Sequence, residues 1–192
     1  MKKRERTQQQ IRAAAMQLAS QIGIDAVDVH AICTEAGVSK RTFFNHFTFK
    51  DEVFAVPPPA YPKASVERFL SGSGPLLEEL VTLLQDQTQE IGEDGETAAV
   101  MHYAMRNNPR IAALQINAMH GMERELASLI ADRLGRAPDD HASIVVAAAA
   151  TAATRIAVDI WIDDRSTDLR DQVARSVLHL RLLNAVPEVA TT

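Results

Sequence analysis

The chain has 192 residues, of which 46% are hydrophobic and 23% are charged, and its net charge is −5. This composition excludes a globally disordered chain, and this length is enough to bury a core. We expect a cytoplasmic protein without a membrane span, because no uninterrupted apolar run is long enough to cross a bilayer and no signal segment follows the charged N-terminus. The single cysteine, Cys33, cannot form an internal disulfide.

The charge is unevenly distributed along the chain. Residues 1–50 contain eight Lys and Arg against four acidic residues, which gives this segment a charge of +4. The remaining residues contain 12 basic and 21 acidic side chains, a charge of −9. A small basic segment ahead of an acidic one indicates a nucleic-acid-binding module followed by a domain that avoids phosphate.

The N-terminus begins with a basic arm, Lys2 to Arg6, which we expect to be mobile until it meets a phosphate backbone; a merely solvated terminus is an equally good interpretation of each single residue. A helix is predicted next and ends at Gly23. Its apolar face consists of Ile11, Ala14, Ala15, Leu18 and Ile22.

Two short helices joined by a tight turn are predicted between residues 28 and 47. Asp28 is a good N-cap for the first, and Gly37 provides the left-handed residue that ends it. Ser39 caps the second, a two-turn helix with an apolar set of Val38, Phe43 and Phe47. The polar side chains of this second helix are too numerous for a core element, so it is predicted to lie in a DNA major groove.

The polar side chains of this segment divide into two predicted roles. Lys40 and Arg41 are expected to read base edges, with Thr42 and Asn45 supporting them, because Lys or Arg to guanine is the commonest specific contact. The backbone phosphates are expected to be held by Lys3, Arg4, Arg6, Ser39, His46 and Lys50.

The run from Gly23 to Glu52, GIDAVDVHAICTEAGVSKRTFFNHFTFKDE, resembles the DNA-binding signature of the TetR family of bacterial transcriptional regulators. The resemblance extends over residues 11–54. It departs from the pattern at Asp28, Cys33 and Phe44. Phe44 stands where the family usually has a tyrosine that reaches a phosphate, and the resemblance implies that this position belongs to the DNA-binding residues. The resemblance implies a DNA operator as partner, a homodimer formed through the last two helices and a ligand held by the middle helices.

Prolines 57–59 and Pro62 interrupt a fourth helix that is predicted to begin at Lys50. The rest of the chain is helical by its periodicity and stop signals. The predicted helices span 64–70, 75–91, 97–107, 109–134, 140–161 and 168–186. The fold class is therefore all-α, with a helix-turn-helix DNA-binding domain at 1–56 and a helical ligand-binding and dimerisation domain at 57–192.

The predicted helix 140–161 is apolar on nearly all sides, and the last predicted helix has apolar residues recurring at helical spacing. Such a pair suits a four-helix dimer interface or, alternatively, the core of a monomer. The residues predicted to form the interface are Ala148, Ala152, Ile156, Val173, Val177 and Leu180.

A ligand pocket is predicted from the methionines and polar groups of the middle helices, although methionine also suits an ordinary core. Its predicted residues are Met101, His102, Met105, Met119, His120, Met122, Arg155 and Trp161. No catalytic set, nucleotide-binding loop or paired metal-ligand spacing occurs in the sequence, so we expect no enzyme, no cofactor and no metal site.

The predicted function is that of a dimeric repressor released from a palindromic operator by a small apolar or amphipathic effector. The alternative is a DNA-binding regulator whose second domain only dimerises or binds a partner protein.

Overall fold

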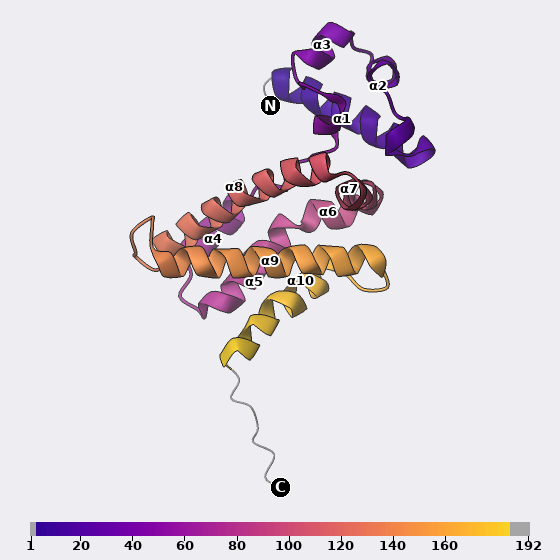
Figure 1. Ribbon diagram of the computed structural model, residues 1–192. Helices are drawn as coiled ribbons and strands as arrows, with labels where there is room; N and C mark the ends of the chain where they lie inside the picture. The colour runs from indigo at the N-terminus through magenta and orange to yellow at the C-terminus, as the bar shows by residue number, and fades with distance from the viewer. Residues whose placement is uncertain (1–2, 185–192) are drawn as a thin grey trace. The chain divides into compact units, whose positions relative to one another are not determined.

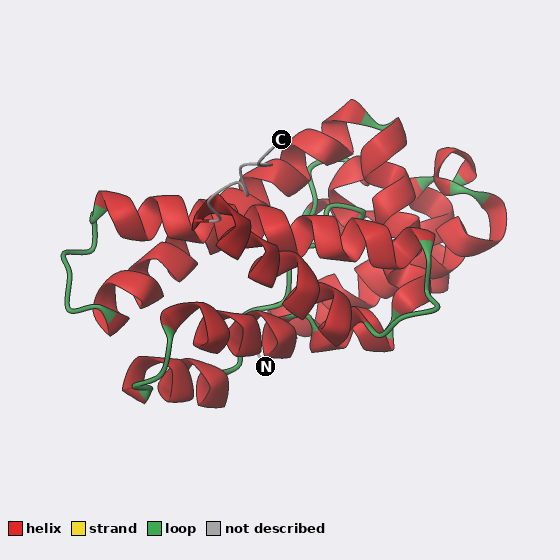
Figure 2. Cartoon of the chain, turned by 90° about the horizontal axis from the view of Figure 1, so that it is seen from below, coloured by secondary structure: helices red, strands yellow, loops and turns green. Residues whose placement is uncertain are grey.

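The computed structural model describes residues 3–184, and every regular element in that range is helical (Figure 1, Figure 2). The predicted all-α fold is confirmed over this range. Three 3-10 segments cover Ile24–Ala26, Lys50–Val53 and His179–Asn184. The α-helices are α1 (Lys3–Ile22), α2 (Val29–Glu35), α3 (Lys40–Phe44), α4 (Lys63–Ser71), α5 (Leu76–Gln87), α6 (Gln89–Glu93), α7 (Gly95–Asn107), α8 (Pro109–Arg133), α9 (His141–Asp163) and α10 (Leu169–Leu178).

The chain forms two compact units. The first, here called the head unit, combines Met1–Pro58 with Asp94–Gly121. The second, here called the body unit, combines Pro59–Glu93 with Met122–Thr192. The inclusion of 94–121 in the head unit was not predicted, and the domain boundary after residue 56 stays a prediction.

The helix ends of the head unit form as their residue types predict. The Asp28 carboxylate accepts from the Ala31 N–H at 2.8 Å, and the Ser39 hydroxyl accepts from the Thr42 N–H at 3.0 Å. Gly37, between α2 and α3, has a φ of 62°, the left-handed conformation that glycine adopts without strain. These three local predictions are confirmed.

The core of the head unit joins α1, α2 and α3 to the two helices that come later in the chain. Phe43 and Phe54 are fully buried together with Ile11 of α1. Ala104 of α7 and Ile111 of α8 belong to the same buried cluster. The DNA-binding motif therefore completes its core with residues that lie about half a chain length away in sequence.

Two expectations about the first helix were wrong. Residues 3–6 form the first turn of α1 and are not a separate arm. Ile22, predicted on the buried face, is 53% exposed because α1 ends there and Gly23 turns the chain away.

The proline-rich segment separates the head motif from α4. Lys50–Val53 forms a 3-10 segment, so the α-helix predicted to begin at Lys50 is absent from the described residues. No regular element covers residues 55–62, which include the four prolines, because proline cannot supply the backbone donor that a helix needs. The short helix predicted at 64–70 is confirmed as α4.

The body unit packs α10 against α9 and α5 (Figure 1). Asp86 of α5 is the polar centre of this unit: it accepts from the Ser65 hydroxyl at 2.8 Å and from Arg170 of α10 at 3.2 Å, and it pairs with Arg68 of α4. These bonds hold α4, α5 and α10 together.

The helices predicted at 97–107, 109–134 and 140–161 correspond to α7, α8 and α9, whereas the single helix predicted at 75–91 is divided into α5 and α6. Asp140 caps α9 through the Ser143 N–H at 2.8 Å, and Asp168 caps α10. The last helix is shorter than predicted, because α10 ends at Leu178 and continues as a 3-10 segment. The predicted end of that helix, residues 185–186, lies outside the described residues.

Within residues 3–184, α9 is the one helix long and apolar enough to cross a membrane by length and composition. One such helix is weak evidence for a membrane span, so the expectation that the chain has none stays a prediction. The core helix of a globular protein passes the same test, and α9 packs on α10 and carries the ion pair Arg155–Asp159 at 3.1 Å.

Candidate nucleic-acid interface

The surface of α3 is the best candidate for contact with nucleic acid. Lys40, Arg41 and Asn45 are exposed on this short helix and the turn that follows it. Phe43 and Phe47 are buried beneath it, with exposures of 0% and 2%. The aromatic side chains thus anchor the helix while its polar side chains face solvent. The helix has five residues, fewer than the two turns predicted.

Ser39 and Thr42 hold the start of α3. The two hydroxyls lie 2.9 Å apart, and Ser39 also caps the Thr42 N–H. Ser39 is exposed and Thr42 is half-buried, so both remain within reach of a ligand on this face. Their roles as DNA contacts stay predictions.

Lys50 is placed differently from the expectation. Its ammonium donates to the carbonyl oxygens of Val27 at 2.8 Å and Ile24 at 3.2 Å. Lys50 therefore ties the 3-10 segment to the residues just before α2. A phosphate contact by the same ammonium stays a prediction, and it has to compete with these two bonds.

The remaining predicted phosphate ligands lie on the outside of the head unit or at its edge. Arg4 and Arg6 are exposed on the first turn of α1. The Lys3 side chain is not described. His46 is half-buried, and its Nδ1 is buried with no hydrogen-bond partner among the described residues.

Arg12 is a functional candidate that the sequence did not single out. Its Nη1 donates to the carbonyl oxygens of Ala55 at 2.8 Å and Val53 at 3.0 Å, and its guanidinium lies 5.2 Å from the centre of the Phe47 ring. Burial lowers the pKa of Arg12. Arg12 thereby fixes α1 to the segment after α3. The sequence shows only that Arg12 is a polar residue of the first predicted helix, which does not indicate the carbonyl oxygens that it binds.

Arg110 connects α8 to the same part of the head unit. Its guanidinium lies 3.7 Å from the centre of the Phe49 ring, close enough for a cation–π contact. It also lies 4.0 Å from the carboxylate of Asp51. Together with the buried Ile111, this contact attaches the start of α8 to the residues that follow α3.

The predicted ligand-pocket residues are divided between the two units. Met101 and Met105 pack against the core of the head unit. In the body unit, Met122 accepts a hydrogen bond from Gln87 at 2.9 Å and Trp161 lies against Arg165. Among the others, His102 and Met119 are half-buried, and His120 and Arg155 are exposed.

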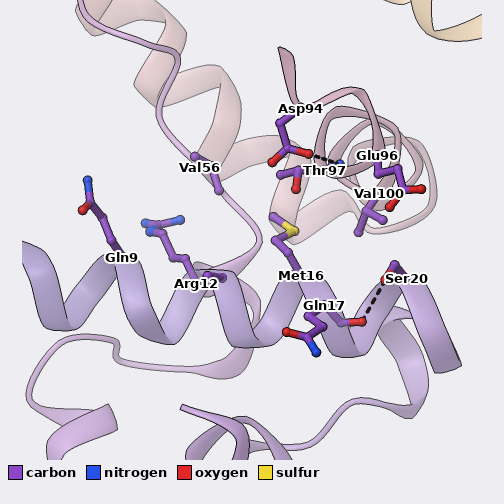
Figure 3. A pocket seen from close by; sticks show the side chains of 11 residues that line it. Gln9, Arg12, Met16, Gln17, Ser20, Val56, Asp94, Glu96, Thr97 and Val100 are labelled. Atoms are coloured by element: carbon purple, nitrogen blue, oxygen red, sulfur yellow. Dashed lines mark hydrogen bonds between the residues drawn. The ribbon is translucent and has the colours of Figure 1, made fainter. Parts of the chain in front are cut away.

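A cavity of about 450 Å³ lies within the head unit and is lined by other residues than those predicted (Figure 3). Its walls come from one face of α1, from Val56 and from the start of α7. Asp94 in this wall caps α7 by accepting from the Thr97 N–H at 3.2 Å. The cavity is lined by Gln9, Arg12, Ala13, Met16, Gln17, Ser20, Val56, Asp94, Glu96, Thr97 and Val100.

The residues predicted to form the dimer interface fall into two groups. Ala152 and Ile156 are exposed on α9, and Ala148 and Leu180 are half-buried. Val173 and Val177 are fully buried inside the body unit, so their assignment to an intermolecular interface was wrong. The periodicity of α10 correctly marked an apolar face, but α9 and α5 of the same chain cover it.

Within the described residues, no group of three or more His, Cys, Asp or Glu side chains is arranged to hold a metal ion.

Two family profiles match the chain. Residues 11–56 match the profile described as "Bacterial regulatory proteins, tetR family", and residues 93–184 match that of the MftR C-terminal domain. The chain belongs to the TetR family. It is thus a member of a family of transcriptional regulators that bind DNA through a helix-turn-helix.

Relatives of known description support this assignment. The HTH-type transcriptional regulator TcmR of Streptomyces glaucescens is 29% identical over 178 residues, which cover 88% of this chain and 78% of TcmR. The fold is shared with the repressor FadR of Thermus thermophilus in complex with lauroyl-CoA (TM-score 0.63, 21% identity, covering 96% of this chain and 98% of that one). It is also shared with FadR of Bacillus subtilis in complex with stearoyl-CoA (TM-score 0.63, 17% identity, covering 90% and 96%).

Proposed function

We propose that this TetR-family regulator is a cytoplasmic homodimeric repressor that binds a palindromic operator and leaves it when a small amphipathic effector binds. The observation that carries the proposal is the exposed cationic face of α3, formed by Lys40 and Arg41, above the buried Phe43 and Phe47. Two such helices related by a two-fold axis enter successive major grooves about 34–36 Å apart.

The exposed apolar side chains of α9 support dimerisation. Val145, Ile156 and Ile160 are 61%, 45% and 44% exposed, and Ala152 is exposed between them. At 100° per residue these four positions lie on one side of the helix. We propose that the same face of a second copy covers them. The predicted residues Ala152 and Ile156 thereby keep their role, and Val145 and Ile160 join them.

The proposed coupling between effector and operator follows the course of the chain. The helix α8 runs from the head unit into the body unit without interruption, since the division between the units falls after Gly121. Its first turn holds the head through Arg110 and Ile111. An effector that displaces α8 in the body unit therefore acts on the segment after α3. Moving the population from 1:99 to 99:1 requires a differential affinity of about 5.5 kcal/mol.

For the effector we propose an amphipathic acyl compound. Two proteins that share the fold are described in complex with lauroyl-CoA and stearoyl-CoA. Met122 of the body unit suits an adaptable apolar wall.

The alternative function is DNA binding without a small-molecule effector. It is favoured by the packing of Met101 and Met105 in the head core and by the bond between Met122 and Gln87, because side chains engaged in this way leave less room for a ligand. In that case the body unit serves dimerisation alone.

The test begins with selection of an operator from random duplexes by the purified protein. Light scattering then gives the subunit number, and operator affinity is measured with lauroyl-CoA and, as a control, with free coenzyme A. The proposal expects an inverted repeat, a dimer in both states and a loss of affinity with lauroyl-CoA alone. An unchanged affinity supports the alternative function, and the absence of any selected sequence contradicts both.

A further inference from the structure

The packing of the head unit does not explain why one large apolar side chain of α3, that of Phe44, is exposed. Phe44, the last residue of α3, is 55% exposed, whereas Phe43 and Phe47 on either side of it are buried. An exposed large aromatic ring gains little from the hydrophobic effect, so the stability of the head unit does not require a phenylalanine at this position.

The ring of Phe44 lies on the same face of the helix as the predicted base-reading side chains. It follows Arg41 by three residues and Lys40 by four, the two spacings that bring side chains together on a helix. Its ring meets that of the buried Phe43 edge to face, with centres 5.3 Å apart and an interplanar angle of 82°. The ring of Phe44 thus has a buried aromatic neighbour, while the side chain as a whole remains 55% exposed.

The chemistry of a phenyl ring restricts what it can recognise in DNA. It carries no hydrogen-bond donor or acceptor, so it cannot bond to a phosphate oxygen or to the polar atoms of a base edge. The apolar group that the major groove displays is the C5 methyl of thymine, which side chains such as phenylalanine contact.

We propose that Phe44 contacts the C5 methyl group of one thymine in each half of the operator and thereby contributes to sequence specificity. This inference rests on the proposed binding of α3 in the major groove. Arg41 and Phe44 then read neighbouring positions by different means, Arg41 by hydrogen bonds to a base and Phe44 by burial of a methyl group.

The test replaces each thymine of the selected operator in turn with uracil, which removes the methyl group and leaves the base-pairing atoms unchanged. At one position in each half-site we expect affinity to fall about fourfold, the equivalent of burying one methyl group, and about 16-fold when both halves are changed. Restoring the methyl group by returning that position to thymine restores the affinity.

Two variants complete the experiment. For Phe44→Ala the uracil substitution is expected to have no effect at that position, whereas Phe44→Tyr, which keeps the ring, retains the fourfold difference. A melting curve shows whether Phe44→Ala is folded, and its affinity for the unmodified operator shows whether it still binds DNA. If wild type and Phe44→Ala respond equally to uracil at every thymine, the proposal is overturned. Failure of the wild type to select any operator overturns the DNA-binding function itself and is distinct from that result.

Discussion

The exposed side chains of α3 and of α9 each indicate a binding surface, but those of α3 are mainly cationic and those of α9 are aliphatic. The five residues of α3 present cationic side chains and one phenyl ring above buried aromatic residues. The 23 residues of α9 present aliphatic side chains on one side and bury the other against α10. A charged face is suited to a highly charged polymer that exchanges with solvent, and an aliphatic face is suited to a permanent protein contact. The comparison indicates that DNA binding and assembly are built on separate surfaces.

The strongest test of the comparison introduces a charge into the apolar face of α9. Ile156→Asp is expected to weaken the dimer by about 3–5 kcal/mol, roughly a hundredfold to several thousandfold, because the carboxylate is buried without a partner. Light scattering over a dilution series measures the effect. Ile144→Asp is the matched control, since Ile144 is 40% exposed on α9 but lies about 120° away around the helix. Equal effects of the two substitutions contradict the proposed interface.

A second test asks whether the polar residues around α3 belong to the DNA surface or to the fold. Lys50→Met removes the ammonium from the carbonyls of Val27 and Ile24. We expect the free energy of unfolding to fall by about 1.5–3 kcal/mol, the range for hydrogen bonds to a charged group. Urea titration measures this loss. A reduction of about one unit in the salt dependence of operator binding indicates that Lys50 also contacts a phosphate.

A third test examines base readout by α3 itself. Arg41→Ala is expected to lower discrimination at one position of each half-site by about 1–3 kcal/mol, because a guanidinium contact to guanine is lost. Repeated operator selection with the variant measures it, and Arg4→Ala serves as a control for loss of an exposed positive charge outside α3. An unchanged selected sequence means that Arg41 is a phosphate ligand or makes no contact.

The smallest expected effect concerns Asp86, whose hydrogen bonds join α4, α5 and α10, and it depends on pH. Burial raises the pKa of Asp86, but hydrogen bonds from Ser65, Arg170 and Arg68 together hold it below its ordinary value. Because the pKa is lower in the folded chain, the stabilisation is present above the ordinary carboxyl value and is lost as the pH falls through the folded value.

Asp86→Asn is therefore expected to lower the free energy of unfolding by about 1–2 kcal/mol near neutral pH and to flatten its decline in acid. Thermal unfolding across a pH series measures this effect. Asp171→Asn is the control, since it removes an exposed acid from α10, the helix that contributes Arg170 to Asp86. If both variants keep the wild-type pH profile, Asp86 does not stabilise the body unit.

Much of the motif around α3 was predictable because its determinants are local. A carboxylate or hydroxyl followed by free N–H groups caps a helix wherever it stands, as Asp28 and Ser39 do. Gly37 likewise ends α2 through its own backbone freedom. The pattern of Phe43 and Phe47 identified the buried side of α3 without knowledge of its neighbours.

The assignment of Val173 and Val177 to a dimer interface failed because it depended on which other part of the chain covers their face. The apolar spacing of Val173 and Val177 marks a buried side, but it does not distinguish a second copy from α9 of the same chain. The methionines Met101 and Met105 were expected in a ligand pocket and lie against the head core.

The sequence by itself determined the all-α class, the helix caps, the family and the cationic face of α3, because each depends on residues within a few turns of one another. Only the tertiary structure decided that 94–121 complete the core of the head, that Arg12 and Lys50 bind backbone carbonyls and that α9 keeps an apolar side exposed. These features arise from contacts between segments distant in sequence. The periodicity of a single helix shows that it has a buried face, and the packing of the whole chain selects what buries it.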